Sequence, residues 1–170
     1  MLLVSERSKF ESVVRAYSAE LYRYAYWLCR DRFTAEDLVQ ETFMRAWQAW
    51  KGLRDDKVAK SWLYTILRNE HARLYERKRL EIDDNQELDD LVDATSGDAY
   101  ESVELRDMLA ALPQGYREPL LLQVLGGFSC AEIASTMNIS EGAVMTRLTR
   151  ARLALRKMSG TETRRRVKER

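Results

Sequence analysis

Hydrophobic residues recur at steps of three and four over residues 10–79, which is the spacing of one face of an α-helix. Three such faces follow one another, in residues 10–30, 35–50 and 61–79. Their members are Phe10, Val13, Val14, Tyr17, Leu21, Tyr24, Ala25 and Leu28, then Leu38, Val39, Thr42, Phe43, Ala46, Trp47 and Trp50, then Leu63, Ile66, Leu67, Glu70 and Leu74. We predict three helices that pack through these faces. Thr34 and Ser61 are the expected N-caps of the second and third helices, because a hydroxyl there accepts a hydrogen bond from a free backbone N–H.

The second half of the chain predicts shorter helices with clear breaks between them. Residues 103–111 have a helical pattern that stops before Pro113, and residues 117–125 form a very apolar helix that ends at two glycines. Ser129 followed by Glu132 is a capping box, so a further helix is expected to begin there. Asn138 can adopt the left-handed backbone conformation that ends such a helix.

A last helix is predicted after Ser140, its expected N-cap. Its buried set is expected to be Val144, Leu148, Ala151 and Leu155, at steps of four, three and four. Two capped helices joined by a short turn form a helix-turn-helix. The predicted fold class is therefore all-α, and 7 Gly and 2 Pro leave little material for the turns of an all-β fold.

Charge is segregated along the chain, although the net charge is only +1. Residues 1–80 carry +5, residues 81–104 carry ten acidic groups and no basic one, and residues 105–170 carry +6. Like charges keep such an acidic strip extended, which is typical of a linker. We predict two small helical domains, residues 1–80 and 105–158, joined by an acidic linker at 81–104 and followed by a frayed basic tail at 159–170. The two basic blocks indicate a polyanionic partner.

The sequence lacks the residues that several kinds of function would need. Cys29, Cys130 and the single histidine, His71, do not have metal-ligand spacing, so the cysteines are interpreted as buried or half-buried thiols. The sequence has no Gly-rich phosphate loop and no nucleophile motif. We therefore expect no metal, no cofactor and no enzymatic activity. No apolar run suits a membrane span or a signal peptide, which predicts a cytoplasmic protein.

Once the buried face of the last helix is assigned, three arginines, two threonines and a methionine remain on its other sides. They are Met145, Thr146, Arg147, Thr149, Arg150 and Arg152. The second helix of a helix-turn-helix enters the DNA major groove, where arginine can bind guanine, threonine can contact phosphate or a thymine methyl, and methionine can make an apolar contact. An Arg-rich helix is often only a solvated surface, but the capped helix ahead of this one favours DNA binding.

The helix predicted at residues 61–79 has a polar side on which basic groups alternate with amide and aromatic groups. That side includes Tyr64, Arg68, Asn69, Arg73 and Arg77. Such a mixture suits unpaired or distorted nucleic acid, because aromatic rings stack on exposed bases. The loop before it, residues 51–60, is either a pocket for an extruded base or an ordinary surface turn.

The helix predicted at residues 35–50 has a polar side that does not suit DNA, since three carboxylates point the same way. Its residues are Glu36, Asp37, Gln40, Glu41, Met44, Arg45 and Gln48. This side is either solvated or a docking face for a basic partner protein.

Together these pieces resemble a bacterial RNA polymerase sigma factor of the extracytoplasmic-function type, over nearly the whole chain. "AEDLVQETFMRAW" resembles the core-binding region 2.2, and "SWLYTILRNEHARLYERKR" resembles regions 2.3 and 2.4. "LPQGYREPLLLQVLGGFSCAEIASTMNISEGAVMTRLTRARLAL" resembles region 4. The resemblance implies a transcription initiation factor that binds core RNA polymerase and promoter DNA and is controlled by an anti-sigma factor.

The resemblance also implies roles for individual residues. The β′ clamp coiled coil of the polymerase would meet Asp37, Gln40, Glu41, Arg45 and Gln48. The −10 element would be melted and held by Leu53, Arg54, Asp55, Lys57, Arg68, Asn69, Arg73 and Arg77. The −35 element would be read by Gln123, Ser140, Met145, Thr146, Arg147, Thr149, Arg150 and Arg152. Leu120, Leu121, Leu122, Val124 and Leu125 would supply core packing and part of the contact with the β flap, and the acidic linker would follow the RNA-exit path.

Two positions depart from the family pattern. Many members have a basic residue where Met145 stands, and many have a charged residue near Gln123. The loss of two positive contacts should reduce the salt dependence of DNA binding, by roughly one unit of slope per lost phosphate contact. The resemblance therefore does not predict that this chain reads the usual −35 sequence of the family.

The main alternative is a helix-turn-helix activator or repressor that binds duplex DNA without joining the polymerase. Residues 1–80 argue against this alternative, because such a regulator would not need them. A sigma mimic that titrates an anti-sigma factor would need a receiver domain, for which 170 residues leave no room. A helical enzyme would need an acid–base or nucleophile cluster that the sequence does not contain.

Overall fold

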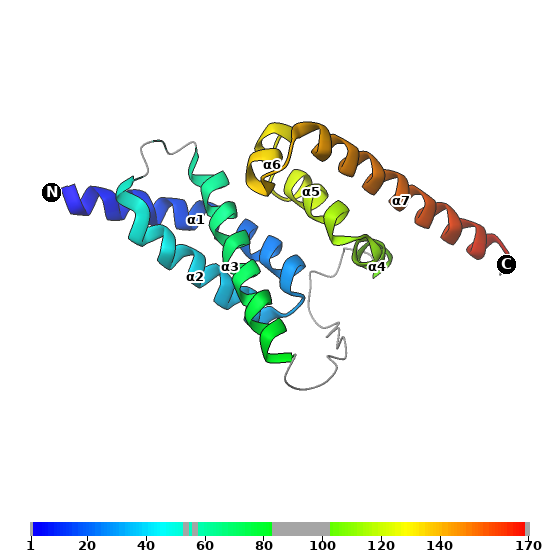
Figure 1. The fold of residues 1–170 in the computed structure, drawn as a ribbon, viewed down its shortest axis with the longest axis horizontal. Helices are drawn as coiled ribbons and strands as arrows, with labels where there is room; N and C mark the ends of the chain where they lie inside the picture. Colours follow the sequence, from blue (N-terminus) through cyan, green and yellow to red (C-terminus); the bar gives the residue numbers. More distant parts are fainter. Residues whose placement is uncertain (1, 53–54, 56–57, 83–102, 169–170) are drawn as a thin grey trace. The chain divides into compact units, whose positions relative to one another are not determined.

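The computed structural model describes residues 2–52, 55, 58–82 and 103–168 (Figure 1). In this part of the chain the secondary structure is helical, with seven α-helices, one short 3-10 helix and no strand. The all-α fold class is confirmed. The chain divides into two compact units, residues 1–93 and 94–170. Most of the segment predicted to be an acidic linker, residues 83–102, lies outside the described residues.

The first unit is a bundle of three long helices, in which each helix packs against the other two (Figure 1). They are α1 (Leu2–Cys29), α2 (Arg32–Ala49) and α3 (Ala59–Ile82), and the 3-10 helix η1 (Trp50–Gly52) follows α2. Residues of the predicted apolar faces fill the centre, and those with no exposed surface include Leu21, Tyr24, Ala25, Ala46, Leu63 and Leu67. Trp47 departs from the prediction, since it is 45% exposed at the edge of the bundle, where it contacts the ring of Phe10.

The predicted N-caps of α2 and α3 were wrong. The N-cap of α2 is Asp31, whose carboxylate accepts hydrogen bonds from the backbone N–H of Thr34 at 2.8 Å and from its hydroxyl at 2.6 Å. Because Arg30 takes a positive φ of 57°, the chain turns earlier and α2 begins at Arg32. Likewise α3 begins at Ala59, so Ser61 lies inside the helix.

The second unit contains α4 (Val103–Ala111), α5 (Gln114–Val124), α6 (Cys130–Met137) and α7 (Glu141–Lys168) (Figure 1). The shorter helices pack against α7, and α5 and α6 also contact each other. Their buried side chains form one core: Leu112, Leu120, Leu121, Leu122, Phe128, Ile133, Val144, Leu148 and Ala151. The set predicted to hold the last helix is thus confirmed, except that Leu155 is only partly buried.

The turn between α6 and α7 has the predicted local chemistry. Ser129 and Glu132 form a complete capping box, in which the backbone N–H of Glu132 donates to the Ser129 hydroxyl at 3.2 Å and the backbone N–H of Ser129 donates to the Glu132 carboxylate at 2.7 Å. Asn138 ends α6 in the left-handed conformation, with φ of 54°. The Ser140 hydroxyl accepts from the backbone N–H of Ala143 at 3.1 Å, which caps α7. The helix-turn-helix is therefore confirmed.

Two boundaries in this unit differ from the predictions. Helix α5 begins directly after Pro113, three residues before the predicted start at Arg117, because proline fixes a backbone angle that suits the start of a helix. Helix α7 continues to Lys168, so the segment predicted to be a frayed tail is helical from residue 159 to residue 168.

Candidate functional site

The outward side of α2 presents the polar residues that the sequence singled out. Asp37, Gln40, Arg45 and Gln48 are exposed and Glu41 is partly exposed. Their separations of three, four and one residues place them along one side of the helix. The same side continues into two exposed apolar groups, since Met44 is 58% and Trp47 45% exposed. Helix α2 thus carries a continuous surface that mixes carboxylates, amides and large apolar side chains.

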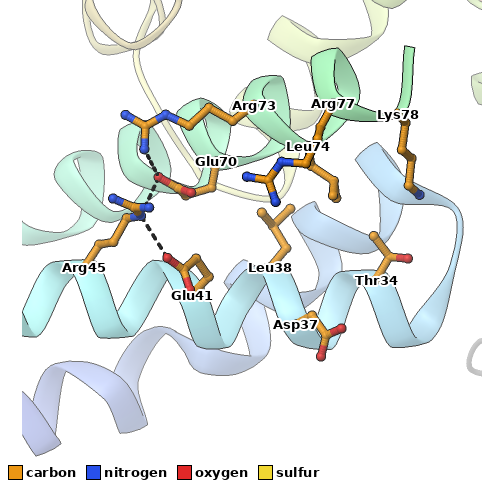
Figure 2. A pocket seen from close by; sticks show the side chains of 10 residues that line it. All are labelled: Thr34, Asp37, Leu38, Glu41, Arg45, Glu70, Arg73, Leu74, Arg77 and Lys78. Carbon is orange, nitrogen blue, oxygen red and sulfur yellow. Dashed lines mark hydrogen bonds and ion pairs between the residues drawn. The ribbon is translucent and has the colours of Figure 1, made fainter. Parts of the chain in front are cut away.

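A hollow of about 380 Å³ lies between α2 and α3 (Figure 2). Helix α2 contributes carboxylates and one arginine, whereas α3 contributes mainly cations. The lining residues are Thr34, Asp37, Leu38, Glu41, Arg45, Glu70, Arg73, Leu74, Arg77 and Lys78. The hollow therefore lies where the polar side of α2 borders the basic side of α3.

A chain of ion pairs crosses this hollow (Figure 2). Arg45 Nε lies 2.9 Å from Glu41 Oε1 on its own helix and 2.7 Å from Glu70 Oε1 on α3. The same Glu70 oxygen accepts a hydrogen bond from Arg73 Nη1 at 2.9 Å. The Glu70 side chain is only 10% exposed, whereas those of Arg45 and Arg73 are 44% and 58% exposed. One buried carboxylate therefore pairs with two arginines that reach the surface.

The basic side of α3 is a ridge of side chains four residues apart. Asn69, Arg73 and Arg77 are exposed along it, and Arg68 beside them is partly exposed. Asp55, from the loop before α3, is also exposed. The other candidates from that loop, Leu53, Arg54 and Lys57, lie outside the described residues.

Tyr64 does not belong to the basic ridge, which corrects the prediction. It has no exposed surface, its ring packs 5.1 Å from that of Tyr24, and its hydroxyl donates to Glu20 Oε1 at 2.6 Å. Burial raises the pKa of Tyr64 far above its usual value, and the hydrogen bond to Glu20 adds to the rise. The ring is a bridge between α1 and α3 and cannot stack on a nucleic-acid base.

Helix α7 presents the predicted recognition side to solvent. Val144, Leu148 and Ala151 anchor the helix on the core of its unit. The opposite sides expose Met145, Thr146, Thr149, Arg150 and Arg152, with Arg147 partly exposed. Met145 is 55% exposed, so its thioether chain is available for contact with a partner.

Side chains from α5 contact two of the arginines on α7. Arg150 Nη1 donates to the hydroxyl of Tyr116 at 3.4 Å, and Arg152 Nη2 donates to Gln123 Oε1. The sequence prediction included Gln123 but missed Tyr116. No local pattern marks Tyr116, because the contact joins residues that are 34 positions apart.

A second hollow, of about 480 Å³, opens between the N-terminal turns of α5 and α7. Its lining residues are Gly115, Tyr116, Gly142, Ala143, Thr146, Arg147 and Arg150. The hydroxyls of Thr146 and Thr149 donate to the backbone oxygens of Gly142 and Met145, at 3.0 and 2.9 Å. Those protons are already used within the helix, whereas Arg147 and Arg150 bring guanidinium groups with several N–H donors to this surface.

Comparison with known proteins assigns both units. The family described as "Sigma-70 region 2" matches residues 13–81, and "Sigma-70, region 4" matches residues 102–155. The ECF RNA polymerase sigma factor SigM of Bacillus subtilis is 32% identical over 154 residues, covering 86% of this chain and 92% of that protein. The chain belongs to the sigma-70 family and is an extracytoplasmic-function (ECF) sigma factor.

Two further proteins agree with this assignment. The ECF sigma factor SigL of Mycobacterium tuberculosis is 32% identical to this sigma factor, with 89% of each chain covered. A co-crystal structure of the sigma factor RpoE in complex with the anti-sigma factor NepR, from Bartonella quintana, matches with a TM-score of 0.74 and 27% identity, over 89% of this chain and 96% of that one. These relatives are sigma factors, which are transcription initiation factors and not enzymes.

The thiols of this sigma factor fit a packing role. Cys29 and Cys130 are both free and half-buried, as predicted. Burial raises the pKa of the Cys29 thiol to about 11, so it stays protonated at neutral pH. In the described part of the chain, no three His, Cys, Asp or Glu side chains gather as metal ligands would. Across the same residues, no helix has the length and hydropathy needed to cross a bilayer.

Proposed function

We propose that this sigma factor binds core RNA polymerase through α2, opens and holds the −10 element with α3, and reads the −35 element with α7. The observation that carries the proposal is the division of surfaces: a polar and apolar side on α2 borders a basic ridge on α3 (Figure 2), and a separate unit carries a capped helix-turn-helix. A regulator that bound only duplex DNA would have no use for the first two surfaces.

The proposed polymerase contact is the exposed side of α2. Asp37, Gln40, Glu41, Arg45 and Gln48 are the polar residues that would meet the β′ clamp coiled coil. Met44 and Trp47 extend the set, because exposed apolar side chains beside charges are the composition of a protein interface. The ion pair with Glu41 also gives Arg45 a fixed direction before a partner arrives.

The proposed −10 surface is the ridge of Asn69, Arg73 and Arg77, with Arg68 beside it. Exposed guanidinium groups at this spacing can follow a phosphate backbone, and an amide can hydrogen-bond a base edge. Asp55 and the neighbouring Leu53, Arg54 and Lys57 stay predictions for the same function. Since Tyr64 is buried, a base that leaves the duplex would need another surface on which to stack.

The proposed −35 surface is the exposed side of α7. Arg147 and Arg150 lie at the N-terminal half of the helix, the part that enters the major groove in this motif. Ser140 and Arg152 would contact the DNA backbone, the methyl groups of Thr146 and Thr149 would suit a thymine methyl, and Gln123 and Tyr116 would orient the guanidinium groups of Arg152 and Arg150. Met145 supplies an apolar contact that suits a thymine methyl.

Two further partners belong to this proposal. The leucines of α5, Leu120, Leu121 and Leu122, are buried in their unit, which leaves the 69% exposed Val124 and the partly exposed Leu125 as the members of this set available to the β flap. An anti-sigma factor is proposed as the inhibitor, since the related RpoE was crystallised with one. A cytoplasmic location stays a prediction and follows from the proposed partners.

Reversal of one charge on α2 tests the polymerase contact. Asp37 is exposed and lies outside the Glu41–Arg45–Glu70 ion pairs, so Asp37→Lys should leave the fold intact. We expect it to weaken binding to core polymerase by about tenfold, because like charges at an interface cost on the order of 1–2 kcal/mol. Fluorescence anisotropy of the labelled chain, titrated with core polymerase, measures the change.

Glu11→Lys is the control, because Glu11 is exposed on α1 of the same unit and its ion pairs with Arg7 and Arg15 are surface pairs within that helix. It should change the affinity for core polymerase less than twofold. Equal affinities of wild type, Asp37→Lys and Glu11→Lys would remove the docking function proposed for α2.

A further inference from the structure

We propose that Glu70 is a positioning residue that couples polymerase binding on α2 to −10 DNA binding on α3. This inference rests on the proposed function of the two surfaces. Its physical basis is that one oxygen, Glu70 Oε1, lies 2.7 Å from Arg45 Nε and 2.9 Å from Arg73 Nη1 (Figure 2). The two arginines belong to different helices and to different proposed surfaces, and this carboxylate connects them.

Burial makes this carboxylate a strong and fixed partner. Glu70 is 10% exposed, so solvent screens its charge less than it screens the pairs at the rim of the hollow. Glu41, on the other side of Arg45, is 42% exposed and holds the same guanidinium from within α2. Arg45 Nε therefore lies between two carboxylates, and the guanidinium carries further N–H donors that can serve a partner.

Competition for one carboxylate gives the coupling its direction. When both arginines pair with Glu70, its single negative charge is shared between them. If a DNA phosphate takes Arg73 away, the whole charge acts on Arg45 and holds that half-exposed side chain more firmly in its position at the hollow. Engagement of the −10 strand should therefore strengthen polymerase binding, and by linkage polymerase binding should strengthen engagement of the −10 strand by the same factor.

A double-mutant cycle separates this coupling from a merely structural function of Glu70. The affinity of the full-length chain for core polymerase is measured, without DNA, for the wild type, Glu70→Gln, Arg73→Ala and the double variant. Glu70→Gln should weaken binding by about fivefold, because Arg45 loses the carboxylate that orients it. Arg73→Ala should tighten binding by about fivefold in the wild-type background and change nothing in the Glu70→Gln background.

Glu76→Gln is the matched control, since it removes an equal charge from an exposed position on α3. In its background, Arg73→Ala should keep its full effect. The thermal unfolding midpoint of each variant reports its fold, and a loss of stability alone would lower affinity without making the effect of Arg73→Ala depend on Glu70.

Two results would overturn the inference: an Arg73→Ala effect of equal size with and without Glu70, or a weakening where tightening is expected. Either result leaves the proposed function in place as long as the wild-type chain binds core polymerase. If the wild-type chain does not bind core polymerase, the proposed function itself fails, so the two failures are distinguishable.

Discussion

Met145 is the residue whose chemistry most distinguishes this recognition helix. It is 55% exposed between the anchoring Val144 and the partly exposed Arg147, at a position where the family resemblance leads us to expect a cation. An apolar side chain cannot neutralise a phosphate, but it can pack against a thymine methyl. This sigma factor should therefore bind its −35 element with fewer ionic contacts and with a preference for an apolar group in the major groove.

Met145→Arg tests this function of the side chain. The added guanidinium should contact a phosphate and make the dependence of log K on log salt steeper by roughly one unit. It should also reduce the preference for the thymine that the methionine contacts. Binding of the holoenzyme to promoter variants at several salt concentrations measures both effects.

Leu153→Arg is the control for Met145→Arg. Leu153 is 49% exposed on the same helix, two turns further on, so the variant adds the same charge away from the proposed contact. If both variants changed the salt slope equally, or if neither changed it, Met145 would have no contact of its own with the DNA.

At the scale of the element, the N-terminus of α2 shows how a cap positions a functional surface. Asp31 accepts two hydrogen bonds from Thr34, and these bonds lower the pKa of its carboxyl below the ordinary value of 3.8, the side-chain bond more than the backbone bond. The cap fixes where α2 begins and hence the rotation of the side that carries Asp37, Glu41 and Arg45. A weaker cap should loosen the first turn of that helix.

Asp31→Ala should lower the free energy of unfolding by about 1 kcal/mol at pH 7, the usual cost of removing an N-cap. A carboxyl whose pKa is lower in the folded state stabilises the fold above its unfolded pKa and loses this effect as pH falls through the folded pKa. The difference between wild type and variant should therefore shrink as pH falls below 3.8. Urea unfolding at pH 7 and at pH 3 measures it.

Asp37→Ala, which removes an exposed carboxylate from the same helix, is the control and should show a smaller loss at pH 7. A difference for Asp31→Ala that is the same at both pH values would mean that the carboxylate charge does not contribute to the cap.

The sequence predicted the elements whose causes are local. Ser129, Asn138 and Ser140 each act on backbone groups within four residues, so the helix-turn-helix could be placed before the fold was known. The caps of α2 and α3 were misplaced because Thr34 competes with a better acceptor three residues earlier, and because the buried Ala59 extends α3 backwards.

Contacts between distant residues explain the rest of what the sequence could not predict. Tyr64 looked like part of a basic surface, yet Glu20, 44 residues away, gives its hydroxyl a buried partner. Tyr116 and Glu70 each pair with an arginine on another helix, which no local pattern could indicate. A helical pattern indicates which residues share a face, but it does not indicate which polar residue meets a partner across the bundle.

At the scale of the whole molecule, the charges are segregated along the sequence, although they almost cancel in total. Residues 1–80 carry +5 and residues 105–170 carry +6, while residues 81–104 carry ten acidic groups. Each of the two basic blocks can attract a polyanion such as the proposed promoter DNA, whereas the proposed polymerase contacts use the side of α2 and Val124. A helix-turn-helix regulator would need only residues 105–170, whereas a sigma factor would also use residues 1–80.

The most direct test of the central claim is run-off transcription with core polymerase, the full-length chain and genomic template fragments. We expect discrete transcripts from specific promoters only when chain and core polymerase are both present, and we expect Asp37→Lys to reduce them. Tight binding of the chain to duplex DNA without core polymerase, together with no initiation in its presence, would contradict the account and favour a regulator that does not join the polymerase.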